Sequence, residues 1–195
     1  MLEVALFGGS FNPPHVAHQM VALYVLETKR VDQLWFVPCF KHPFDKTLAS
    51  FEDRHRMCEL AAEALGPRAH VSQVERELGG ESLTLRTVRR LQAERPEASF
   101  SLVIGSDLSS ESRRWFGADE LRQVVPFITV ARARAGEGAA ATEADEGAGG
   151  LVMPPVSSTE IRDALAAGRS VAGLVPARAL DYIYARGLYG AQRPA

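Results

Sequence analysis

Short apolar runs alternate along the chain with stretches in which apolar residues recur every three or four positions. The apolar runs predict strands at 3–7, 34–38, 70–75, 100–105 and 126–132. The other stretches predict helices at 16–29, 51–65, 82–94, 117–125, 158–167 and 176–186. Strands that alternate with helices pair in parallel through right-handed crossovers. The pattern therefore predicts an α/β fold with a doubly wound, mainly parallel sheet.

Two of the predicted helices have a clear apolar side. In the first helix this side carries Val16, Met20, Leu23 and Leu26. In the basic helix over 82–94 the inward positions are Leu85, Val88 and Leu91.

Residues 134–150 break the alternation. Eleven of these 17 residues are Ala or Gly, four are acidic, and none is a large apolar residue. Such a segment buries too little surface to fix its own conformation, so we expect a mobile loop.

Composition narrows the class of protein. With 195 residues the chain suits one domain spanning 1–195, and 46% hydrophobic with 24% charged residues is ordinary for a globular protein. A net charge of -2 argues against a large nucleic-acid surface, so we expect no nucleic-acid partner. Two cysteines make no disulfide or zinc framework. No apolar run has the length of a membrane span and no leader is evident, so we expect a cytoplasmic protein with no membrane partner.

The stretch "GGSFNPPHVAH" at 8–18 directly follows the first strand. Glycines let backbone amides approach a ligand closely, and the two prolines suit the entry to a helix. His15 and His18 are three residues apart and share a helix face, at a helix start where free N–H groups favour anions. The stretch predicts a polyphosphate site, although it lacks the lysine of a P-loop. An ordinary turn, or a metal site with His42 or His55, are the alternatives.

The same stretch resembles the G-x-F-x-P-x-H-x-x-H motif of the HxGH nucleotidyltransferase superfamily, with Ala17 in the place of a glycine. "IGSD" (104–107) and "SSTEIR" (157–162) resemble two further motifs of that superfamily. Their order and spacing, and the ending "LVPARALDYIYARGLYG", are most similar to bacterial nicotinate-nucleotide adenylyltransferases. The resemblance covers nearly the whole chain and implies a Rossmann-like fold of the nucleotidyltransferase type.

The resemblance implies adenylyl transfer from ATP to nicotinate mononucleotide, with release of pyrophosphate. Mg²⁺ would be carried by the ATP phosphates, without metal ligands from the protein. The implied catalytic residues are His15, His18 and Arg162, with His18 nearest the reacting centre. The implied ATP-binding residues are Gly8, Gly9, Ser10, Phe11, Gly105, Asp107, Ser157, Ser158 and Thr159. The helical part from about residue 156 would complete the ATP site.

Two of these segments also have purely structural interpretations. Ser157 to Glu160 has the S-x-x-E pattern of a capping box, which by itself explains a helix start. Asp107 could simply cap the next helix. A capped helix start is also an anion site, so Arg162, about one turn further on, remains compatible with phosphate binding.

The acceptor side departs further from the family pattern. The resemblance implies that Lys41, His42, Thr84, Trp115 and Arg132 bind the mononucleotide, with the Trp115 indole stacked on the pyridine ring. Leu83 stands where the family has an aromatic residue, and the proline expected after Arg132 is absent. Trp115 could equally be a partly buried core residue, and 40–46 a solvated loop.

Other functions compete with this hypothesis. The same chemistry could act on nicotinamide mononucleotide or phosphopantetheine, and a non-catalytic ATP-binding regulatory module is an alternative of another class. Class I aminoacyl-tRNA synthetases share an H-x-G-H element, but this chain has no K-M-S-K-S string and little room for tRNA binding. A homo-oligomer is left open.

Overall fold

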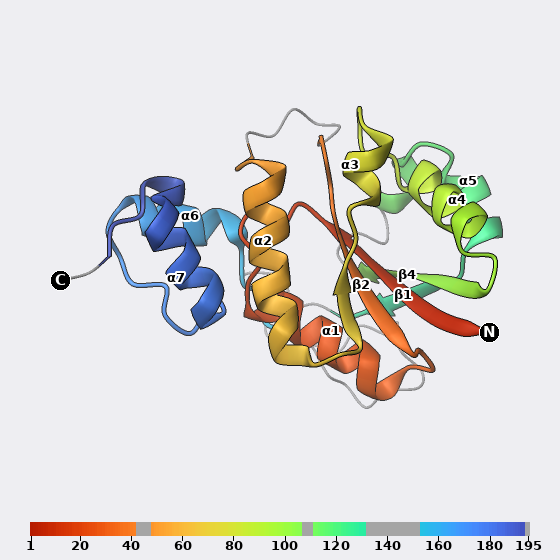
Figure 1. Cartoon of the computed structure of the whole chain (residues 1–195), viewed down its shortest axis with the longest axis horizontal. Coiled ribbons are helices and arrows are strands. Elements are labelled where there is room, and N and C mark those ends of the chain that lie inside the picture. Colours follow the sequence, from red (N-terminus) through yellow and green to blue (C-terminus); the bar gives the residue numbers. More distant parts are fainter. Residues whose placement is uncertain (42–47, 107–110, 132–152, 194–195) are drawn as a thin grey trace.

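A five-stranded parallel sheet forms the centre of the molecule. The computed structural model describes residues 1–41, 48–106, 111–131 and 153–193. The strands lie in the order β3-β2-β1-β4-β5, and every neighbouring pair is parallel (Figure 1). Their bounds are β1 Leu2–Gly9, β2 Gln33–Pro38, β3 Ala69–Val71, β4 Ala98–Gly105 and β5 Phe127–Val130. The predicted parallel α/β fold is confirmed.

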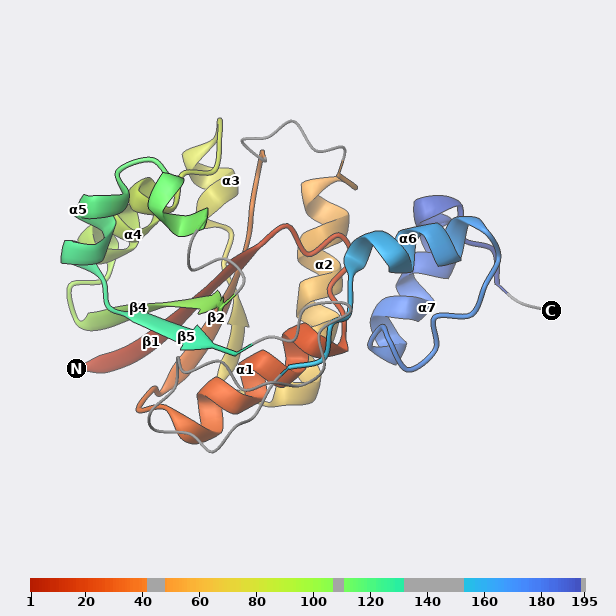
Figure 2. The ribbon, with the colours of Figure 1, turned by 180° about the vertical axis from the view of Figure 1, so that it is seen from behind.

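Helices cover both faces of the sheet. On one face lie α1 (Val16–Thr28) and α2 (Phe51–Ala62), and on the other α3 (Val74–Leu78), α4 (Thr84–Glu94) and α5 (Ala118–Val124) (Figures 1 and 2). Single 3-10 turns extend α2 at Glu63–Leu65 and precede α5 at Glu111–Arg114.

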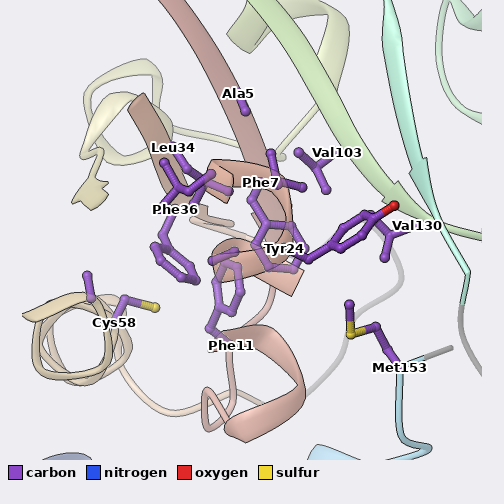
Figure 3. Packing of buried hydrophobic residues seen from close by; sticks show 14 residues of the cluster. Ala5, Phe7, Phe11, Tyr24, Leu34, Phe36, Cys58, Val103, Val130 and Met153 are labelled. Atoms are coloured by element: carbon purple, nitrogen blue, oxygen red, sulfur yellow. The ribbon is translucent and has the colours of Figure 1, made fainter. Parts of the chain in front are cut away.

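Alternation along β1 divides the core into two layers. Ala5 and Phe7 belong to the cluster under α1 and α2, shown in Figure 3, whereas Val4 and Leu6 belong to the cluster under α3 to α5. Neighbouring side chains of a strand point to opposite faces, so a strand buried on both faces must be apolar at every position. This requirement explains the unbroken run "VALF".

The first helix buries only part of the predicted apolar side, namely Leu26 fully and Val16 partly. Met20 and Leu23 are 39% and 51% exposed, whereas the buried residues of α1 are Ala17, Ala22, Tyr24, Val25 and Leu26. Apolar residues occur all around this helix, so its sequence pattern does not select one face. The alanines let the helix backbone approach the sheet closely, and that packing decided the face. In α4, by contrast, the predicted Leu85, Val88 and Leu91 are all buried.

The prediction of a strand over 70–75 holds for residues 70 and 71 only. β3 ends at Val71, and Val74 begins α3 instead. The Ser72 N–H still donates to the Phe36 carbonyl (2.8 Å), but the Ser72 hydroxyl accepts from the Val74 N–H (3.3 Å) and starts a helical turn. A serine that bonds its own neighbouring backbone offers an alternative to the strand ladder, which explains the early end.

The last two helices leave the sheet. α6 (Ser158–Ala166) and α7 (Ala177–Arg186) are followed by a 3-10 turn at Leu188–Gly190, and lie beyond α2 at one end of the molecule (Figures 1 and 2). Their buried residues form a third cluster with Met57 and Leu60 of α2. α2 therefore serves two cores, one toward the sheet and one toward the C-terminal helices.

Several sequence-based expectations fall on residues outside the described part of the chain. These are the Ala/Gly-rich segment 134–150 and the candidate site residues His42, Asp107 and Arg132. Within the described residues, no helix is both long and apolar enough to cross a membrane.

Candidate active site

The strand order reverses between β1 and β4, and the predicted motifs meet there. The chain runs from β1 outward through β2 to β3, and then returns to place β4 on the other side of β1. Phe7 pairs with Val103, so Gly9 and Gly105, two residues further along each strand, end adjacent strands. Ligands of open parallel sheets bind at such a point, beyond the carboxyl ends of the strands.

The two glycines at the end of β1 have different roles. A Cβ on Gly8 would meet nothing within 4 Å, so this backbone stays open to a ligand. A Cβ on Gly9 would lie 3.1 Å from Cζ of Phe11, so Gly9 makes room for that ring. The left-handed backbone that glycine tolerates falls instead on Phe11, with φ 46°. Phe11 as a whole residue is 1% exposed, and its ring packs in the core cluster under α1 and α2.

The two histidines are brought face to face at the start of α1. His15 is the N-cap residue and His18 is the third residue of the helix, and their ring centroids are 3.7 Å apart. The His15 N–H donates to Nδ1 of His18 (3.1 Å). Because Nδ1 accepts this bond, the neutral His18 ring carries its proton on Nε2, which makes Nε2 a hydrogen-bond donor.

Aromatic packing fixes the His18 ring. The Phe11 ring meets it edge-on with centroids 4.9 Å apart, and the Phe7 ring lies 5.9 Å away. The ring is half-buried, between these aromatic neighbours and the solvent. A donor held in this way needs little reorganisation to meet an anion.

The start of α6 is hydrogen-bonded to the segment that precedes His15. The Ser158 hydroxyl donates to the Pro13 carbonyl (3.0 Å), and Nη1 of Arg162 donates to the Asn12 carbonyl (2.9 Å). Nη2 of Arg162 also donates to the Thr159 hydroxyl (3.2 Å). The motif at 8–18 and the motif at 157–162, about 145 residues apart in the chain, are thus in direct contact.

The start of α6 differs from the predicted capping box. The Ser157 hydroxyl accepts from the Thr159 N–H (3.2 Å) rather than from the N–H of Glu160. Glu160 is exposed. Ser157 therefore caps the helix through the Thr159 N–H.

Sequence reasoning missed two buried polar residues in the site. Asn12 is 2% exposed and Arg54 is 1% exposed, and both bind backbone groups of the loops beyond β1 and β2. Asn12 lay unremarked inside the quoted motif. Arg54 could have been found from its position, because it lies on the same side of α2 as Phe51 and Cys58, where a charge is unexpected.

A further polar cluster, also unpredicted, docks α7 onto α2. The Asp53 carboxylate accepts from the Ser50 hydroxyl (2.8 Å), from the Tyr182 hydroxyl (2.8 Å) and from Nε of Arg186 (3.3 Å). Burial raises the pKa of Asp53, but these hydrogen bonds and the Arg186 charge outweigh it and hold that pKa below its ordinary value.

The acceptor-side candidates come from three separate segments. Lys41 is exposed, and its carbonyl accepts from the Ser82 N–H (3.0 Å), two residues before Thr84 begins α4. This bond brings the segment before Thr84 next to Lys41, and Thr84 itself is half-buried. Trp115 is also half-buried and packs against the cluster under α3 to α5. This packing matches the structural interpretation of the indole and leaves part of it exposed.

Comparison with known proteins decides the family. Residues 6–164 match the model of the cytidylyltransferase-like family. A probable nicotinate-nucleotide adenylyltransferase of Anaeromyxobacter dehalogenans (strain 2CP-C) is 45% identical over 96% of this chain and 96% of its own length. One from Myxococcus xanthus is 40% identical over 98% and 97%. The chain belongs to the nicotinate-nucleotide adenylyltransferase family.

Solved structures show the same fold. The nicotinic acid mononucleotide adenylyltransferase of Plasmodium falciparum, solved in complex with NaAD, superposes with a TM-score of 0.79. It is 21% identical to this chain, over 97% of this chain and 98% of that one. As a member of the adenylyltransferase family, the protein is a nucleotidyltransferase with a Rossmann-like fold.

The described donors suit phosphates better than a cation. The Nε2–H of His18, the guanidinium of Arg162 and the two helix starts all present hydrogen-bond donors. No group of three or more His, Cys, Asp or Glu side chains in the described part of the chain could hold a metal ion. Mg²⁺ commonly binds through substrate phosphates and one or two carboxylates, which does not require such a group.

Proposed function

We propose that this adenylyltransferase joins the phosphate of nicotinate mononucleotide to the α-phosphorus of ATP, giving deamido-NAD and pyrophosphate. An oxygen of the mononucleotide phosphate attacks the α-phosphorus, and the bond from that phosphorus to the bridging oxygen breaks. Curated relatives more than 40% identical carry the name of this activity, which supports the substrate pair.

One observation carries the proposal. Arg162 and Ser158, at the start of α6, are hydrogen-bonded to the carbonyls of Asn12 and Pro13, directly before the histidine pair. Two helix starts, two imidazoles and a guanidinium therefore converge at the switch point of the sheet. Phosphoryl transfer needs chiefly positioning and stabilisation of charge on the phosphoryl oxygens, and such a set of donors supplies both.

The residues divide into three roles in this proposal. The Nε2–H of His18 donates to the reacting phosphate, with His15 beside it, and Arg162 neutralises the departing pyrophosphate. The open backbone at Gly8 receives the nucleotide, together with Gly105 at the end of β4 and the hydroxyls and amides at the start of α6. On the acceptor side, Lys41 binds the mononucleotide phosphate, Thr84 the carboxylate, and Trp115 the pyridine ring. His42, Asp107 and Arg132 keep the roles that the sequence resemblance implies.

The proposal extends to the organisation of the chain. We place the whole chain in one catalytic domain, whose helical part from about residue 156 completes the ATP site; the hydrogen bonds from α6 to residues 12 and 13 support this. Mg²⁺ would arrive on the ATP phosphates. A cytoplasmic location agrees with the use of ATP.

The test is pyrophosphate release from ATP with a panel of acceptors. Nicotinate mononucleotide should support turnover, and phosphopantetheine should not. Turnover with phosphopantetheine alone would overturn the acceptor assignment. ATP binding without pyrophosphate release for any acceptor would favour a regulatory ATP-binding module.

The carboxylate and carboxamide acceptors should differ. Thr84 begins α4, and the apolar side chain at the N-cap position, Leu83, cannot occupy the first N–H groups of that helix. A carboxylate can accept from these N–H groups and from the Thr84 hydroxyl, whereas an amide would leave its own hydrogens unpaired. We expect kcat/KM for nicotinate mononucleotide to exceed that for nicotinamide mononucleotide by about 10²-fold. Equal values would overturn the preference and leave adenylyl transfer intact.

A further inference from the structure

The backbone of Ala49 is held at both its N–H and its carbonyl by buried side chains. Its N–H donates to Oδ1 of Asn12 (3.0 Å), and its carbonyl accepts from Nε of Arg54 (3.0 Å). Asn12 belongs to the phosphate-binding segment beyond β1, and Ala49 to the segment that leads from β2 into α2. The two segments are therefore joined by a specific pair of hydrogen bonds as well as by apolar packing.

Arg54 extends this link to two more places. Nη1 donates to the Ser10 carbonyl (3.0 Å) and lies 3.8 Å from Sγ of Cys39, and Nη2 donates to the Phe40 carbonyl (3.4 Å). One guanidinium thus holds Ser10 on the ATP side together with Phe40 and Ala49 on the acceptor side. Lys41 directly follows Phe40, so its backbone position depends on this link.

Stability alone does not explain an arginine at this position. Burying a guanidinium costs several kcal/mol of solvation, and a buried charge is often replaced by apolar residues of similar volume without loss of stability. The recorded hydrogen-bond partners of Arg54 are three backbone carbonyls and one sulfur, all in loops beyond the carboxyl ends of β1 and β2. What the rigid fork of an arginine provides, and an apolar side chain cannot, is a fixed spacing between these loops.

Asn12 connects the same link to the ATP side. Its Oδ1 also accepts from the Tyr189 hydroxyl (2.8 Å), and its carbonyl accepts from Arg162 (2.9 Å). One buried residue thus contacts the start of α2, the C-terminal end of the chain and the arginine proposed to bind the pyrophosphate. A displacement of Asn12 would move these groups relative to one another.

We propose that Arg54 and Asn12 are positioning residues of the transfer reaction: they hold the acceptor-side segments at Phe40 and Ala49 against the phosphate-binding segment, so that the two substrates meet in line. The proposal rests on the proposed adenylyl transfer. Since a misplacement of about 1 Å can cost about 10²-fold in rate, loss of this link should lower kcat more than ATP binding.

The first test replaces Asn12 by alanine, which keeps the carbonyl that accepts from Arg162. We expect kcat to fall about 10²-fold, while the Kd for ATP changes by less than about threefold. Tyr182→Phe is the matched control. It removes the part-buried hydrogen bond from the Tyr182 hydroxyl to Oδ1 of Asp53 (2.8 Å), which also joins the C-terminal helices to the rest of the chain. This control should keep its kcat even if its melting temperature falls.

Two further variants keep the test decisive. Tyr189→Phe removes only the hydroxyl that donates to Oδ1 of Asn12, leaves the bond from Ala49 in place, and should keep kcat within about threefold of the native protein. Arg54→Lys keeps the charge but cannot span three carbonyls, and should lower kcat about as much as Asn12→Ala. If Arg54→Lys does not fold, the comparison of Asn12→Ala with Tyr189→Phe decides. A folded Asn12→Ala protein with kcat within about threefold of native, or an Asn12→Ala and a Tyr189→Phe protein with equal kcat, would overturn the proposal.

Amide exchange separates this proposal from the proposed function. The Ala49 N–H should exchange with solvent much faster in Asn12→Ala than in the native protein or in Tyr182→Phe, whether or not turnover is measured. Unchanged protection would overturn the link between Asn12 and Ala49. Absence of pyrophosphate release by the native protein, with Ala49 protection lost in Asn12→Ala, would instead overturn the proposed function alone.

Discussion

The phosphate side and the acceptor side of the site are built in different ways. On the phosphate side, side chains from α2 and α6 bind backbone carbonyls at Ser10, Asn12 and Pro13, and a backbone N–H orients the His18 ring. On the acceptor side, Lys41 is exposed, and its segment is joined to the start of α4 by backbone bonds and by the Ser82 hydroxyl, which accepts from the Phe40 N–H (2.8 Å). Arg54 also holds the Phe40 carbonyl, but the candidate side chains of the acceptor side, Lys41, Thr84 and Trp115, are exposed or half-buried. The proposed phosphate side is therefore the more preorganised of the two.

This difference matches what each side has to do. Charge develops on the phosphoryl oxygens during transfer, and donors that are fixed beforehand stabilise it without a cost of reorganisation. The acceptor has to enter, bind by its ring and its anionic groups, and leave as part of the product. Substitutions on the phosphate side should therefore affect the rate most, and those on the acceptor side should affect chiefly KM for the mononucleotide.

The largest effect is expected from His18→Ala. Loss of the oriented Nε2–H should lower kcat/KM by about 10²-fold or more, with the fold retained. His70→Ala, at an exposed position of β3, is the control and should be nearly normal. Steady-state pyrophosphate release measures both. Near-normal turnover of a folded His18→Ala protein would contradict the role of His18 and the greater importance of the phosphate side for the rate.

Arg162→Lys should have the next largest effect. A lysine keeps the charge but cannot bind the Asn12 carbonyl, the Thr159 hydroxyl and a phosphate with one planar fork. We expect kcat/KM for ATP to fall about tenfold, chiefly through kcat, and KM for the acceptor to change little. Arg169→Lys, an exposed arginine after α6, is the control. A larger effect on the acceptor than on ATP would show that the two sides are not separate.

Trp115→Ala sharpens the comparison from the other side. Loss of ring stacking should raise KM for nicotinate mononucleotide about tenfold and leave KM for ATP nearly unchanged. Trp115→Phe keeps an aromatic face and should lie between the two. If the melting temperature falls but KM for neither substrate changes, Trp115 is a core residue only. Its packing against the cluster under α3 to α5 would allow this outcome.

The smallest effect on turnover is expected at the contact between α2 and α7. Asp53→Asn removes a carboxylate whose pKa is lowered in the folded protein, so its stabilising contribution is present above the ordinary carboxyl pKa and is lost as pH falls through the lowered value. At pH 7 the variant should be less stable by about 1–2 kcal/mol, the size of a hydrogen bond to a charged group.

The pH profile is the control for that prediction. Denaturant unfolding should show the two proteins approaching each other in stability as the pH falls below about 4, because the Asp53 carboxyl of the unfolded chain takes up a proton there, before the folded carboxylate with its lowered pKa does. The turnover of Asp53→Asn should remain within about twofold of native, because Asp53 touches the docking contact and not the reacting groups. A stability difference that is the same at pH 3 and pH 7 would contradict the assignment of the effect to the charge.

Much of the fold could be predicted because several requirements coincided in the same residues. The run at 3–7 had to be a buried strand, and glycines, prolines and histidines directly after it could only form a turn into a helix start. His15 and His18 therefore lie together as predicted. The buried side of α1 could not be predicted, because its apolar residues surround the helix and only contact with the sheet selects among them.

The polar residues at the centre of the site show the limit of the sequence more clearly. Nothing in the local pattern joins Asn12 to Ala49 and Tyr189, or Arg54 to Ser10 and Phe40, because these partners are up to 177 residues apart. Every residue has a backbone carbonyl, so a hydrogen bond to that carbonyl cannot be inferred from the type of the accepting residue. Such bonds become visible only when the chain is folded.

The sequence by itself determined the alternating elements, the parallel sheet and the pairing of His15 with His18 at the helix start beyond β1, because periodicity and turn chemistry act over a few residues. The tertiary structure alone decided which side of α1 is buried, where β3 gives way to α3, and how α6 is held against residues 12 and 13. Those outcomes depend on long-range packing and on backbone hydrogen bonds, which the order of side chains along the chain does not encode locally.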